Sequence, residues 1–211
     1  MRKPTVLAVA IVVIVVVAFL VWSYKQRLPH GVAKPSPESG EITAELRRTL
    51  PAELFPTTGV QWIPQQGGAK PPNALSAGEE FLEHDPGRPR TLYVCRAAHG
   101  SGVHPGKLVG GACNIGFGGD ELEKRQYEVA AYVGGSWGNH GLGGALVGGY
   151  EAGRKLYVCR HHLTETLWPC PWCKNDYGWH AGKFLPDTGE CNFGYGGREL
   201  SDDEDNEFFY P

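Results

Sequence analysis

The part of the chain with the most chemical potential is a pair of cysteines two residues apart, Cys170-Pro171-Trp172-Cys173, with histidines nearby. Two thiolates and one or two imidazoles from His161, His162 or His180 would complete a tetrahedral zinc site. A thiol-disulfide exchange motif is a second interpretation, but it needs βαβ surroundings, which the sequence lacks. A loop closed by its own disulfide, Cys170 to Cys173, is favoured, because the other cysteines indicate an oxidising compartment.

Those other four cysteines occur at matched places in two similar halves of the chain. The sequence Leu-Tyr-Val-Cys-Arg occurs at residues 92–96 and again at 156–160, and each copy is followed by a second cysteine. Because both cysteines recur together, we expect each pair to form a disulfide between neighbouring strands in an oxidising compartment. Four buried free thiols are the alternative. The expected disulfides join Cys95 to Cys113 and Cys159 to Cys191.

The duplication extends beyond the cysteines. A tryptophan precedes each Leu-Tyr-Val-Cys-Arg copy, and Gly-Lys, Cys-Asn and Gly-Gly-x-Glu steps follow it. A unit of about 75 residues is longer than a solenoid repeat and shorter than most domains. We therefore expect two repeats, 60–135 and 136–211, related by a pseudo-twofold axis and packed as one domain. The second repeat carries the Cys/Trp-rich insertion.

Composition favours an all-β fold. The chain has 30 glycines and 16 prolines among 211 residues, and it lacks long helical apolar patterns after the N-terminal region. Short strands joined by tight turns are typical of such sequences.

The charge and the motifs exclude several functional classes. The net charge is −3 and basic residues do not cluster away from the N-terminal apolar run, so nucleic acid is not an expected partner. Gly106-Lys107 does not belong to a phosphate-binding loop, because the required upstream glycine and following Ser/Thr are missing. The sequence has neither a nucleophile elbow nor a His-Glu-x-x-His segment. We expect no catalysis, no cofactor and no bound metal.

The N-terminal region predicts a membrane anchor. An unbroken apolar run over residues 6–22 covers about 26 Å as a helix, close to the hydrocarbon thickness of a bilayer. Large residues occupy the place of a cleavage signal, which disfavours a removed secretory peptide. The expectation is a single transmembrane helix within residues 1–28, a linker over 29–59, and a domain on the non-cytoplasmic side.

Taken together, the landmarks resemble the DM-nine repeat family, a module that occurs as tandem pairs and in the lectin-like part of natterin-type proteins. The resemblance covers residues 60–210. It implies an all-β, pseudo-twofold domain and, for the best-understood members, recognition of mannose-type sugars without catalysis. The residues that carry it are the repeated tryptophan, Ala-Leu-x-x-Gly, Leu-Tyr-Val-x-Arg, Pro105 to Leu108, Cys113, Cys191, the Gly-Gly-x-Glu steps and Tyr127-Glu128-Val129.

The resemblance also implies two ligand-binding sites, each made of an acidic residue and a lysine. They correspond to Glu80 with Lys107 in the first repeat and to Glu151 with Lys183 in the second. A carboxylate accepts hydrogen bonds from sugar hydroxyls and an ammonium donates to their oxygens. Exposed ion pairs without a ligand are the alternative. The relatives usually have Asp in place of Glu, and the first repeat inserts residues 81–90.

The sequence therefore predicts a membrane-anchored lectin-like protein with two weak sites for mannose-type glycans. A protein-binding or assembly module of the same fold is the alternative, and a zinc- or thiol-dependent protein is a third. Formation of a homo-oligomer is left open.

Overall fold

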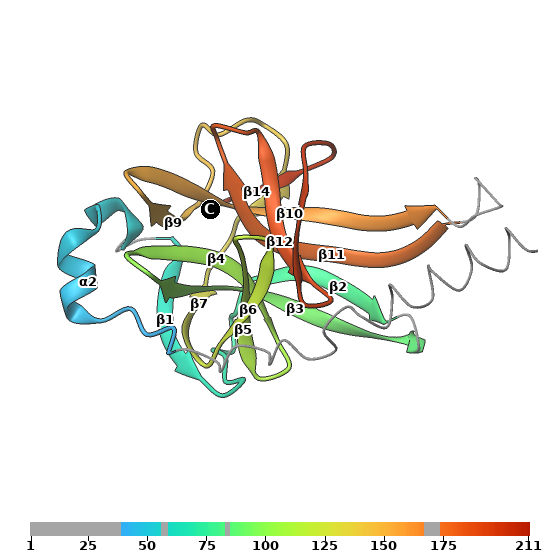
Figure 1. Cartoon of the computed structure of the whole chain (residues 1–211), viewed down its shortest axis with the longest axis horizontal. Helices are drawn as coiled ribbons and strands as arrows, with labels where there is room; N and C mark the ends of the chain where they lie inside the picture. Colours follow the sequence, from blue (N-terminus) through green and yellow to red (C-terminus); the bar gives the residue numbers. More distant parts are fainter. Residues whose placement is uncertain (1–38, 56–58, 83–84, 167–173) are drawn as a thin grey trace, which may run out of the picture. The chain divides into compact units, whose positions relative to one another are not determined.

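The structure is a computed structural model that describes residues 39–55, 59–82, 85–166 and 174–211 (Figure 1). The anchor expected within residues 1–28 lies outside this range, and so do Cys170 and Cys173. None of the helices in the described ranges is long and apolar enough to cross a membrane.

Strands make up most of the described chain, which confirms the all-β expectation. Two short helical segments, α2 (Ala44–Thr49) and η1 (Ala52–Leu54), come first. The first half continues with β1 (Gln61–Gln66), β2 (Ser76–Leu82), β3 (Asp85–His99), β4 (Gly102–Val109), β5 (Ala112–Phe117), β6 (Asp120–Lys124) and β7 (Gln126–Ala131). The second half has β8 (Ser136–Gly138), β9 (Val147–Glu151), β10 (Arg154–Thr166), β11 (Lys174–Leu185), β12 (Glu190–Tyr195), β13 (Arg198–Asp202) and β14 (Glu207–Tyr210).

Six strands close into a β-barrel to which each half contributes three. Around the barrel, β3 pairs with β4, β4 with β9, β9 with β10, β10 with β11, β11 with β2, and β2 with β3. The pairs β4–β9 and β2–β11 are equivalent contacts between the halves. Neither half therefore completes the barrel by itself, and closure pairs strand edges that would otherwise be open.

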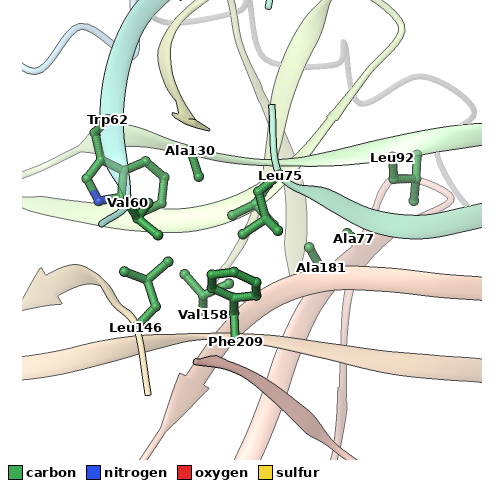
Figure 2. Packing of buried hydrophobic residues seen from close by; sticks show 11 residues of the cluster. Val60, Trp62, Leu75, Ala77, Leu92, Ala130, Leu146, Val158, Ala181 and Phe209 are labelled. Atoms are coloured by element: carbon green, nitrogen blue, oxygen red, sulfur yellow. The ribbon is translucent and has the colours of Figure 1, made fainter. Parts of the chain in front are cut away.

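A hydrophobic core shared by both halves combines side chains of the barrel strands with side chains of β1, β7 and β14 (Figure 2). Burial of these side chains removes their apolar surface from water, which is the main stabilising contribution to such a fold. The first half contributes Val60, Trp62, Leu75, Ala77, Leu92, Val94 and Ala130, and the second contributes Leu146, Val158, Ala181 and Phe209.

A reciprocal contact between two hairpin turns also joins the halves. The backbone N–H of Glu121 donates to the carbonyl of Gly197 at 3.3 Å, and that of Glu199 donates to Gly119 at 3.0 Å. Each glutamate carboxylate also accepts the N–H of the opposite glycine, Gly197 at 2.9 Å and Gly119 at 3.0 Å. Gly119 and Gly197 have positive φ angles of +92° and +83°, which residues with side chains disfavour. This contact explains why Gly-Gly-x-Glu occurs in both repeats.

Both expected cysteine pairings are present, but the expectation that they join neighbouring strands is wrong, because β4 lies between β3 and β5 and β11 lies between β10 and β12. Cys95 is bonded to Cys113 with Cα atoms 5.9 Å apart, and Cys159 to Cys191 with Cα atoms 6.0 Å apart. Each joins a long barrel strand, β3 or β10, to the strand two places further along the chain, β5 or β12. All four cysteines are fully buried, so the disulfides belong to the packed interior.

The stretch 39–55, expected within a linker, packs against one end of the barrel. Its side chains Ile42, Leu50 and Leu54 are buried in a cluster with Ala98 of β3 and Val103 of β4. The side chain of Thr43 caps α2 by accepting the N–H of Leu46 at 3.2 Å. The helix is only six residues long and would not persist in isolation, so tertiary packing holds it. We refer to residues 39–55 as the N-terminal cap.

The N-terminal cap should contribute to the stability of the domain. Leu54 is fully buried, so Leu54→Ala should lower the free energy of unfolding by about 2–4 kcal/mol. Arg48 is exposed on the same segment, and Arg48→Ala should change it by less than about 0.5 kcal/mol. Chemical unfolding of the full chain measures both. Equal stability of Leu54→Ala and the wild type would show that the cap is not part of the folded unit.

Candidate ligand-binding site

The first expected acid and lysine pair is assembled. Glu80 lies in β2 and Lys107 in β4, and the Lys107 Nζ is 3.3 Å from Oε1 of Glu80. The second half adds a third member, His180 of β11, whose Nδ1 lies 3.0 Å from the same Nζ. Because an ammonium only donates, Nδ1 accepts, and the protonated Nε2 donates to the carbonyl of Tyr177 at 3.1 Å.

Further groups balance the charge of this cluster. Oε1 of Glu121 is 3.8 Å from Lys107 Nζ, and the ring of Tyr195 lies 5.3 Å from it. The Nε of Arg90 donates to Oε2 of Glu80. The Arg90 side chain is 43% exposed, whereas Glu80, Lys107 and His180 are buried. Arg90 is therefore the charged group of the cluster that water reaches most easily.

The second expected pair is not assembled. The Lys183 Nζ donates to the carbonyl of Gly116 at 2.7 Å and lies 3.2 Å from Oε1 of Glu199. Glu151 is half-buried and forms no ion pair with Lys183 in the described part of the chain. Its register partner in β10 is Arg154, which instead pairs with Asp187 at 3.0 Å.

The reason for this difference is the length of the hairpins. Glu151 is the last residue of β9, next to the turn that leads into β10. Glu80 corresponds to it, but β2 continues beyond Glu80 into the insertion of residues 81–90 and pairs with Gly178 of β11. The insertion therefore places the first carboxylate inside the structure and leaves the second at a strand end.

The alternative of exposed ion pairs is wrong for both lysines. Lys107 and Lys183 are both buried, and each ammonium contacts groups of both halves. The ring centroid of Phe117 lies 5.1 Å from Lys183 Nζ, and the ring centroid of Tyr195 lies 5.3 Å from Lys107 Nζ. A buried ammonium must be held by hydrogen bonds and counter-charges, and both lysines have them.

Sequence reasoning missed the role of the histidines. Each repeat contains His-x-Gly-Lys, with His104 before Lys107 and His180 before Lys183. The sequence indicates His180 only as a candidate zinc ligand, yet both of its ring nitrogens have partners at the Lys107 cluster. The recurrence of His three residues before the lysine was the signal that could have identified it. Within the described ranges, no three His, Cys, Asp or Glu residues are grouped as a metal site would require.

Burial keeps both histidines neutral. Burial, and secondarily the nearby Lys107, lower the pKa of His180 to about 2. Burial and Lys183 lower the pKa of His104 to about 3. Burial also lowers the pKa of Lys107, while the adjacent carboxylates of Glu80 and Glu121 oppose that shift. The cluster therefore combines a neutral imidazole acceptor with an ammonium that its counter-charges hold.

These pKa values predict acid lability. The pKa of each histidine is lower in the folded state than the usual 6.5, so the unfolded chain takes up protons first as the pH falls. The contribution of the neutral histidines to the free energy of unfolding is therefore fully present above about pH 6.5. Below that pH the free energy of unfolding falls by up to about 1.4 kcal/mol per pH unit for each histidine. When the pH falls from about 7 to about 5, the free energy of unfolding of His180→Gln should decrease by about 2 kcal/mol less than that of the wild type. Denaturant unfolding at several pH values measures this, and identical pH dependence would contradict a neutral, buried His180.

The two interlocked halves, closed into one barrel, define a tandem-repeat all-β protein. The chain belongs to the DM9 repeat family, whose sequence model matches residues 88–202. Among solved structures, it is similar to the nematode sperm cell motility protein MFP2B, with 13% identity and a TM-score of 0.46. The match covers 72% of this chain and 44% of that one, so this chain spans less than half of that protein. No curated protein matches the sequence.

Proposed function

We propose that the protein is a non-catalytic recognition module that binds sugars of the mannose type at Glu80 and Lys107. The observation that carries this proposal is the Glu80–Lys107 pair itself. Two strands bring together the carboxylate and ammonium that the family resemblance implies, 3.3 Å apart, beneath a partly exposed arginine. A carboxylate and cations at one place suit adjacent sugar hydroxyls, which both donate and accept hydrogen bonds.

The contacts around the pair favour a pre-organised site. His180 and Glu121 contact the Lys107 ammonium together with Glu80, so little side-chain entropy is lost on binding. Arg90 occupies Oε2 of Glu80, and a sugar hydroxyl would take over that contact as the exposed guanidinium turns outward. The affinity for a single sugar should be about micromolar to millimolar.

We propose one such site per chain. Lys183 donates to a backbone carbonyl and pairs with Glu199, whereas Glu151 lies at a strand end. This asymmetry between the halves supports a single working site where the sequence predicted two.

The location is also proposed. Two disulfides support an oxidising, non-cytoplasmic compartment for the domain. The apolar run over residues 6–22 supports attachment to a membrane. Clustering on a membrane would raise the avidity of weak sites.

Substitution of the two equivalent glutamates tests the proposal. Glu80→Gln keeps the size of the side chain but removes the charge, and should weaken sugar binding at least about 10-fold, since charge-assisted hydrogen bonds are lost. Glu151→Gln is the same change at the equivalent place and should leave the affinity within about 2-fold. Isothermal titration of the full chain with mannose and mannobiose, in a detergent without a sugar headgroup, measures both.

Other outcomes are equally decisive. Loss of binding in Glu151→Gln alone would move the site to the second repeat. Absence of heat with either sugar at millimolar concentration would contradict sugar binding and favour the protein-binding alternative.

A further inference from the structure

An arginine closes each end of the barrel. Arg96 of β3 and Arg160 of β10 are the last residues of the two Leu-Tyr-Val-Cys-Arg copies. Each donates through Nε to a glutamate, Glu128 or Glu207, at 2.8 Å in both cases. Each also stacks on the repeated tryptophan, with the guanidinium carbon 4.2 Å from the Trp62 centroid and 4.6 Å from that of Trp137.

At the Arg96 end, the N-terminal cap completes this arrangement. The carbonyl of Leu54 accepts from NH1 of Arg96 at 2.8 Å, and the ring of Phe55 lies 5.1 Å from the guanidinium carbon. Arg47 of the cap pairs with Oε1 of Glu128, the oxygen that Arg96 leaves open. As a result the side chains of Arg96 and Glu128 are only 0% and 3% exposed.

At the Arg160 end, the same groups reach the surface. Both Nε and NH2 of Arg160 donate to Oε2 of Glu207, and within the described ranges Oε1 has no hydrogen bond or ion pair. The side chains of Arg160 and Glu207 are 17% and 29% exposed. The ring centroid of Trp179 lies 4.3 Å from the guanidinium carbon of Arg160, so Trp179 contacts Arg160 as Phe55 contacts Arg96 at the other end.

The residues around the two ends differ in polarity. Ala98, Val103 and Tyr150 lie against the apolar side chains of the cap at the Arg96 end. The strand registers place His162, Trp179 and Glu79 at the equivalent positions of the Arg160 end. The Arg160 end is therefore unsuited to an apolar cap. Among the described side chains named at this end, the carboxylates of Glu79 and Glu207 outnumber the guanidinium of Arg160, so this end attracts cations.

We propose that the Arg160 end, formed by Glu79, Trp137, Arg160, Trp179 and Glu207, is a docking surface for a basic segment of a partner protein. An arginine or lysine of the partner binds Oε1 of Glu207 as Arg47 binds Oε1 of Glu128. The chain itself shows this mode of recognition at the Arg96 end, where a peptide segment supplies the cation. A cation beside half-buried tryptophans gains additional attraction from the aromatic rings.

Binding of a blocked hexa-arginine peptide to the full chain in a zwitterionic detergent tests the surface. Isothermal titration should show that Glu207→Gln weakens binding at least about 5-fold, because the charged acceptor is lost. Asp203→Asn removes the same charge from an exposed turn outside the surface, and should weaken binding by less than about 2-fold. Circular dichroism checks that Glu207→Gln is folded. The exposed Glu79→Gln, which breaks no described ion pair, should weaken binding about 2-fold or more.

Three results would overturn the proposal. Wild-type protein that does not bind the peptide has no such surface. Equal weakening by Glu207→Gln and Asp203→Asn would indicate general attraction to a negative protein. Displacement of the peptide by mannobiose, in a protein that also carries Glu80→Gln, would make the Arg160 end a sugar site.

Discussion

The mutual contact of the two Gly-Gly-x-Glu turns is the constraint on which the rest of the structure depends. Each glutamate reaches the turn of the other half, and the same carboxylate lies beside a buried lysine, Glu121 at Lys107 and Glu199 at Lys183. The contact between the halves and the counter-charge of each lysine are thus the same group. Loss of either glutamate would leave an ammonium with less compensation and separate two hairpins, so assembly and site formation are linked.

Sequence duplication produces geometric symmetry in the barrel but not chemical symmetry in its sites. The strands, the disulfides and the Arg–Glu–Trp groups repeat. The sites differ because the first repeat extends its hairpin past Glu80, while the second ends at Glu151. The barrel ends differ because one carries the N-terminal cap and the other carries Trp179. The insertion after Glu80 and the N-terminal cap are additional chain outside the common repeat, whereas Trp179 is a different residue at a position that both repeats share.

Features that recur within the sequence could be predicted from it. The repeats, the all-β fold, both interstrand disulfides and the proximity of Glu80 to Lys107 follow from matched positions and the family resemblance. Features formed by pairing across the halves could not. His180 joins Lys107 only because β11 of the second half closes the barrel against β2. The cap has too few apolar residues to be distinguished from a linker without its contact surface on Ala98 and Val103.

Closure of the barrel also fixes how many repeats it holds. Within the residues that the structure describes, every barrel strand already has two neighbours once β2 has paired with β11 and β4 with β9, so no barrel edge is left for another copy. The first and last strands of each repeat are also paired with each other, β1 with β7 and β8 with β14. A third consecutive copy would have no partner, unlike a unit added to an open solenoid. Growth of such a gene by tandem duplication should therefore proceed in pairs, with even repeat numbers preserved and odd ones lost.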